Sequence, residues 1–101
     1  MKVYEVTITR PWDGRETYSI HITRKGALQV ACIEGLDALI ALDDDGISGD
    51  DLTWVEGSLE TLINPEHRLT IEELDVIFNK CEELLWNIEM EIQVDEHTLQ
   101  P

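Results

Sequence analysis

The chain has 101 residues, which is enough for one domain with a single hydrophobic core. It carries 22 aspartates and glutamates against 7 lysines and arginines, a formal net charge of -15. This balance excludes direct binding to nucleic acid, which requires cations that replace the counterions of the phosphates, and it disfavours an anionic membrane surface for the same reason.

Two alternating segments predict a β-hairpin at the start of the chain, over residues 1–9 and 16–23. An Asp-Gly pair between them indicates a turn. The pattern places His21 on the polar face of the second strand. The apolar side chains gather on one face of each strand: Tyr4, Val6 and Ile8 in the first, and Tyr18, Ile20 and Ile22 in the second.

Residues 25–42 predict a helix that is apolar over most of its circumference. We expect such a helix to be central in the fold or to meet a second partner as well, which leaves a homodimer open. Cys32 lies in this helix and Cys81 in a later one, with no CxxC motif. We expect both to be reduced core thiols, with a disulfide between the two helices as the alternative.

Residues 52–63 allow either a helix or a strand, and the spacing of their leucines favours a helix, with Ser48 or Asp50 as its cap. A third helix begins at a capping box formed by Thr70 and Glu73. We expect Trp86 to close this helix inside the core. Residues 87–95 then alternate strictly and predict a third strand with one wet face.

These elements predict an α+β fold with the order β-β-α-α-α-β. We expect a small three-stranded antiparallel or mixed sheet with the helices packed on one face. No internal repeat, low-complexity tract or linker divides the chain, so residues 1–101 are interpreted as a single acidic domain.

No motif indicates catalysis, a cofactor or a metal site. The acidic segment 43–51 resembles a calcium loop only superficially, because Leu52 stands where the EF-hand needs a bidentate glutamate. Three histidines are scattered without a second ligand at metal-binding spacing: His21, His67 and His97. We therefore expect a protein that is not an enzyme.

The start of the chain has no signal-peptide pattern and no apolar run is long enough to span a bilayer, so we expect a cytoplasmic location.

The uneven distribution of charge is the strongest signal in the sequence. Residues 1–25 carry five lysines and arginines and three carboxylates, whereas residues 26–101 carry two and nineteen. We expect a partner with a basic surface to bind three groups of carboxylates. The loop tryptophan Trp12 either serves as an apolar anchor for that partner or folds back to cover the open end of the sheet. The groups are Glu72, Asp75 and Glu82 on a helix, Glu89, Glu91 and Asp95 along a strand face, and Asp43, Asp44, Asp45, Asp50 and Asp51 in a loop.

The favoured hypothesis is a non-catalytic inhibitor that occupies the nucleic-acid site of a basic protein. Rows of carboxylates on a helix can imitate the charge density of a phosphate backbone. Phage anti-CRISPR and anti-restriction proteins are similar in size and charge. The alternative is a dedicated binding partner, such as an immunity protein for a nuclease toxin or a subunit of an obligate complex. A surface charge that serves only solubility is the third reading.

Overall fold

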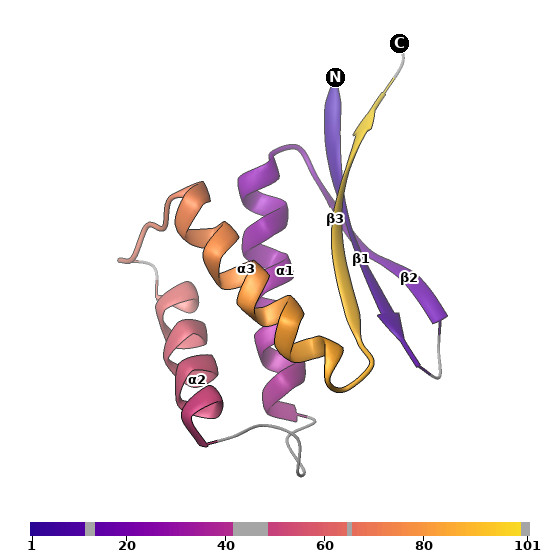
Figure 1. The fold of residues 1–101 in the computed structure, drawn as a ribbon. Coiled ribbons are helices and arrows are strands. Elements are labelled where there is room, and N and C mark those ends of the chain that lie inside the picture. Colours follow the sequence, from indigo (N-terminus) through magenta and orange to yellow (C-terminus); the bar gives the residue numbers. More distant parts are fainter. Residues whose placement is uncertain (12–13, 42–48, 65, 100–101) are drawn as a thin grey trace.

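The computed structural model, which describes residues 1–11, 14–41, 49–64 and 66–99, has the predicted order of elements. Three antiparallel strands form one open sheet, with the first strand in the middle and the second and third on its two sides. The first and third helices contact one face of this sheet, and the second helix packs against the first (Figure 1). The α+β prediction is confirmed, and the sheet is antiparallel throughout. The elements are β1 (Lys2–Arg10), β2 (Gly14–His21), α1 (Arg24–Ala41), α2 (Gly49–Ile63), α3 (Ile71–Trp86) and β3 (Glu91–Thr98).

The central strand β1 divides the sheet into an apolar and a polar face, as its alternation predicts. Val6 and Ile8 point toward the helices and are buried. Their partners on β3 are Val94 and Ile92, which pack into the same core. The opposite face carries Glu5, Thr7 and Thr9 of β1, and no helix of the described chain covers it (Figure 1).

The prediction that Tyr18, Ile20 and Ile22 share one apolar face is wrong, because a β-bulge in β2 changes the face of the sheet to which the following side chains point. The register shifts between Val6, which faces Ser19, and Thr7, which faces Thr17, so Tyr18 is an extra residue. Beyond the bulge, Ile20 lies opposite Glu5 on the polar face and is 64% exposed. Strand β2 ends at His21, which lies opposite Tyr4 on the helix-facing side rather than on the polar face.

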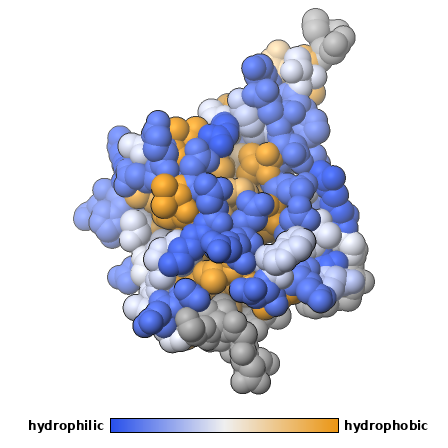
Figure 2. Space-filling model, viewed as in Figure 1, coloured by the Kyte–Doolittle hydropathy of each residue, from blue (hydrophilic) through white to orange (hydrophobic). Residues whose placement is uncertain are grey.

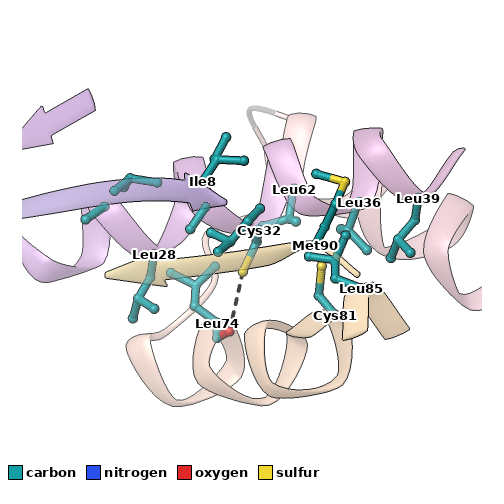
Figure 3. Packing of buried hydrophobic residues seen from close by; sticks show 14 of the residues in the cluster. Ile8, Leu28, Cys32, Leu36, Leu39, Leu62, Leu74, Cys81, Leu85 and Met90 are labelled. Atoms are coloured by element: carbon teal, nitrogen blue, oxygen red, sulfur yellow. Dashed lines mark hydrogen bonds between the residues drawn. The ribbon is translucent and has the colours of Figure 1, made fainter. Parts of the chain in front are cut away.

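Helix α1 is the centre of the fold, which explains why it is apolar over most of its circumference. It contacts all three strands and both other helices. Figure 3 shows its side chains Leu28, Cys32, Leu36 and Leu39 within the core. Although α1 has 18 residues, none of the helices in the described ranges is apolar enough to cross a membrane.

Helices α1 and α3 approach each other closely where Gly35 faces Cys81. A Cβ atom on Gly35 would lie 2.6 Å from the Cys81 sulfur and 3.3 Å from the side chains of Leu85 and Ile92. Both cysteines are buried and unpaired, as the preferred interpretation predicts. The Cys32 thiol donates a hydrogen bond to the carbonyl of Leu74, 3.6 Å away (Figure 3).

The two later helices form at their predicted places. Helix α2 confirms the helical interpretation of residues 52–63, but it begins at Gly49, so Asp50 lies inside the first turn and is not the cap. Ser48 lies outside the described residues. At the start of α3 the capping box is complete: the Thr70 hydroxyl accepts from the Glu73 amide, and the Glu73 carboxylate accepts from the Thr70 amide.

We expect Gly35→Ala to lower the free energy of unfolding by about 1–3 kcal/mol, because the new methyl group overlaps the Cys81 sulfur. Chemical denaturation measures this change. The matched control is Gly57→Ala in α2, where nothing lies within 4 Å of the new Cβ, and which should stabilise the protein by about 0.5–1 kcal/mol. Adding Cys81→Ala to Gly35→Ala should recover part of the loss. Equal unfolding midpoints for Gly35→Ala and the wild type would contradict the close approach.

We expect the stability to fall as the pH rises from about 9 to 12. Burial raises the pKa of Cys32 and Cys81 from an ordinary value near 9.0 to about 12. In this window the unfolded chain releases two thiol protons that the folded chain retains, so unfolding becomes more favourable. Urea unfolding at pH 7.5 and pH 10 measures the loss, and the variant Cys32→Ala/Cys81→Ala should lose less stability over the same interval. An identical pH dependence of the two proteins would refute this account.

Candidate acidic binding surface

The structure describes eight of the twelve residues of the predicted binding site. Four of the predicted residues lie outside the described residues: Trp12, Asp43, Asp44 and Asp45. The other eight lie on three separate parts of the molecule, namely helix α3, the start of helix α2, and the sheet with the turn before β3. They do not form one continuous row.

The predicted row on α3 is interrupted at its middle residue. Glu72 and Glu82 are exposed, whereas Asp75 is half-buried and forms a two-point ion pair with Arg24 at the start of α1. The two guanidinium-to-carboxylate distances are 2.9 and 3.4 Å. Asp75 therefore joins α3 to α1 and is less available to a partner than its neighbours.

Glu89 lies in a turn and not on a strand face, because α3 closes with a Schellman pattern. The amide of Met90 donates to the carbonyl of Leu85, and the amide of Glu89 donates to that of Trp86. Glu89 adopts a left-handed conformation with φ of 60°, which glycine or asparagine usually fills. The strand consequently begins at Glu91, four residues later than its alternation predicts.

The carboxylates on the polar face of the sheet are already engaged. Asp95 of β3 forms an ion pair of 3.0 Å with Arg15 of β2. The ion pair joins the two outer strands across β1, since Arg15 lies opposite Thr9 and Asp95 lies opposite Glu5. Glu91 accepts a hydrogen bond from Gln93. At the centre of the face, Glu5 is hydrogen-bonded to two side chains that lower its pKa, Thr17 and His97. These carboxylates are therefore held by partners within the sheet.

Asp50 and Asp51 have a local role at the start of α2. Both lie in the first turn of the helix, where a negative charge interacts favourably with the unpaired backbone amides. Asp51 is half-buried, while Asp50 is exposed. The charge of this segment therefore contributes to helix stability as well as to the surface.

The structure reveals an outward stripe on α3 that the sequence interpretation missed. Its members recur at helical spacing on the side opposite the core, and all are exposed: Glu72, Val76, Asn79, Glu83 and Trp86. Trp86 was expected in the core but is 74% exposed, and Val76 is 69% exposed. Trp86 follows the buried Leu85 by one residue, which places it about 100° further round the helix. The helical period alone could have shown this.

Cations are almost absent from α3, which carries the stripe, and from α2. Helices α2 and α3 together hold nine carboxylates and a single lysine, Lys80. The Lys80 ammonium lies 4.6 Å from the centre of the Trp54 ring on α2, so it joins the two helices by a cation–π contact. We name the exposed carboxylates of α2 and α3 the α2–α3 acidic surface: Asp50, Glu56, Glu60, Glu72, Glu73, Glu82 and Glu83.

The face of the molecule that includes α3 combines charge with isolated apolar patches. Figure 2 shows hydrophilic side chains over most of this face, broken by several separate hydrophobic areas over the helices and next to the sheet. Beside Trp86 an open hollow of about 500 Å³ lies between the end of α3 and the start of β3. An exposed tryptophan next to a hollow and a charged rim is typical of a protein–protein contact.

Comparisons with protein-family models, with curated proteins and with solved structures find no match to this chain. Within the described ranges, no group of three or more histidines, cysteines or carboxylates is arranged to hold a metal ion. The function is therefore inferred from the surface of the chain itself.

We expect Glu89→Gly to raise the free energy of unfolding by about 1 kcal/mol, because glycine adopts the left-handed conformation of this turn without the steric cost that a Cβ atom adds. Thermal and urea unfolding measure the gain. Glu91→Gly is the matched control: it removes the same side chain from the first residue of β3 and should destabilise the protein. A loss of stability in Glu89→Gly would contradict the assigned turn.

Proposed function

We propose that the protein is a non-catalytic inhibitor that binds a basic, nucleic-acid-handling protein in the cytoplasm and blocks its DNA or RNA site. The α2–α3 acidic surface is the proposed contact. The observation that carries the proposal is the outward stripe of α3, where two large apolar side chains, Val76 and Trp86, stand exposed among carboxylates.

The charge on this surface is available because little of it is neutralised. The described chain has four ion pairs of lysine or arginine with a carboxylate; three of them lie within the sheet, and the fourth joins Arg24 to Asp75. The exposed glutamates of α3 form no ion pair among these contacts. Unneutralised charge of one sign speeds the encounter with a basic groove and makes binding sensitive to salt.

The apolar residues of the stripe would supply the binding free energy that exposed charges alone do not. Exposed ion pairs contribute little free energy, whereas a buried tryptophan at an interface commonly contributes about 2 kcal/mol or more. Glu72 and Glu83 flank Val76 and lie 11 residues apart, which is about 16 Å along the helix axis. A phosphate backbone advances about 3.4 Å per residue of one strand, so these two carboxylates span about five phosphates.

A dedicated partner protein, such as an immunity protein or a subunit of an obligate complex, is the second candidate. It is favoured by the exposed apolar side chains of the edge strand β2 and its continuation, Tyr18, Ile20 and Ile22, which are 49%, 64% and 72% exposed. Such an interface would be mainly apolar. Its affinity would change little between 50 mM and 500 mM salt, whereas binding to the α2–α3 acidic surface would weaken steeply.

The target can be isolated from a nuclease-treated lysate of the native host by affinity purification, and its affinity measured by calorimetry. We expect the triple charge reversal Glu72→Lys/Glu82→Lys/Glu83→Lys to weaken binding by at least about tenfold, because it places cations against a basic surface. Trp86→Ala should weaken it by about 2 kcal/mol.

The matched control is Glu16→Lys on β2, an exposed charge reversal away from the α2–α3 acidic surface, which should leave the affinity within about twofold of the wild type. The proposal fails if the triple variant and Trp86→Ala both bind as the wild type does. It also fails if the target has no nucleic-acid site or if nucleic acid does not compete for it. If the proposal passes these tests, the same variants test for anti-CRISPR or anti-restriction activity in phage infection.

A further inference from the structure

A second site lies at the other end of the helical layer, in a pocket of about 280 Å³. Its lining residues come from the first turns of α1, the end of α2, residues 67–69 before α3 and the first turn of α3. Its lining includes two aliphatic side chains from the core, Leu62 and Leu74, and it has a polar rim. The rim is formed by Lys25, Gln29, Asn64, His67 and Arg68.

This pocket collects the cations that the rest of the fold leaves without a partner. Five of the 7 lysines and arginines are engaged: Lys2, Arg10, Arg15 and Arg24 in ion pairs, and Lys80 on the Trp54 ring. In the part of the chain that the structure describes, neither Lys25 nor Arg68 forms an ion pair or a ring contact. Both line this pocket.

The lining contains no aspartate or glutamate, in a chain that has 22 of them. Three other surface hollows each include at least one carboxylate: Glu89 and Glu91 in one, Glu34 and Asp37 in another, and Glu16 in the third. A cationic pocket free of carboxylates is therefore a specific feature of this place and does not follow from the overall composition.

The position of Lys25 is unfavourable without an anion. It lies in the first turn of α1, where the positive end of the helix dipole disfavours a cation. Its neighbour Arg24 is balanced by Asp75, at 2.9 Å. No carboxylate occupies the first turn of α1 to balance Lys25. An anion in the pocket would compensate both Lys25 and the end of the helix.

We infer that this pocket binds a phosphate monoester on a small organic molecule. The two permanent cations match the charge of about -2 that a phosphate monoester carries at neutral pH, whereas a carboxylate would leave one cation uncompensated. Arginine offers a planar pair of donors to phosphate oxygens, and lysine adds a point charge. The leucines at the base of the pocket would accept a short apolar part of the ligand, and the volume is near the lower limit for small-molecule sites.

The site is independent of the α2–α3 acidic surface, so the two proposals can fail separately. Phenyl phosphate is the probe, added to the 15N-labelled full chain at constant ionic strength and followed by amide chemical shifts. We expect saturable shifts of the amides of Lys25, Gln29, His67 and Arg68. Inorganic phosphate should bind more weakly because it lacks the apolar part, and benzoate more weakly because it carries one charge.

Each of the variants Lys25→Gln and Arg68→Gln should weaken phenyl phosphate binding by about tenfold. Both side chains belong to exposed residues, so we expect both variants to fold, and their amide spectra check this. The matched control is Lys2→Gln on β1, which removes one cation from the sheet and should leave the affinity unchanged. The assignment is overturned if these amides show no saturable shift, if the double variant Lys25→Gln/Arg68→Gln binds as the wild type does, or if benzoate binds as tightly as phenyl phosphate.

Discussion

The contact between Gly35 and Cys81 is the constraint on which the arrangement of the helices depends. Because α1 presents no side chain there, α3 approaches closely enough for Cys81, Leu85 and the β3 residue Ile92 to surround the glycine. Helix α1 can then touch the sheet and both other helices at once. The buried residues of α3 are fixed by this contact, and so is the direction of its opposite side, which carries Trp86.

The end of α3 follows from the same packing. Leu85 and Met90 are both buried, and they are the two residues that a Schellman closure normally brings together. The amide of Met90 bonds to the carbonyl of Leu85, so the chain reverses within a few residues and β3 starts next to β1. Glu89 accepts a left-handed conformation because the contacts on either side of it determine the path of the backbone.

The sequence pattern predicted the elements that depend on local signals. The alternation of β1, the apolar circumference of α1 and the capping box at Thr70 each act within a few residues, and each was confirmed. The bulge in β2 was missed, because it depends on the register against β1 and not on the alternation of β2 alone. The start of β3 was missed because residues 87–90 alternate in hydrophobicity although they form a turn.

The available charge of the candidate surface could not be predicted from the sequence, for a different reason. A carboxylate in the sequence does not reveal whether a cation neutralises it, and the pairs Arg15–Asp95 and Arg24–Asp75 join residues 80 and 51 positions apart. The row of Glu72, Asp75 and Glu82 was correct in helical spacing but not in available charge. Trp86 was assigned to the core from its position at the end of an apolar helix, although its angle to Leu85 points outward.

The ion pairs also explain how one small domain can carry surfaces of opposite charge. With only 7 lysines and arginines, each cation that pairs within the sheet is unavailable to the helices, and the exposed glutamates of α3 form no ion pair within the described residues. The same distribution leaves Lys25 and Arg68 together at the end of the helical layer. At physiological ionic strength, charges separated by more than about 8 Å are largely screened. An anion in the pocket would therefore respond mainly to the cations that line it and only weakly to the net charge of -15.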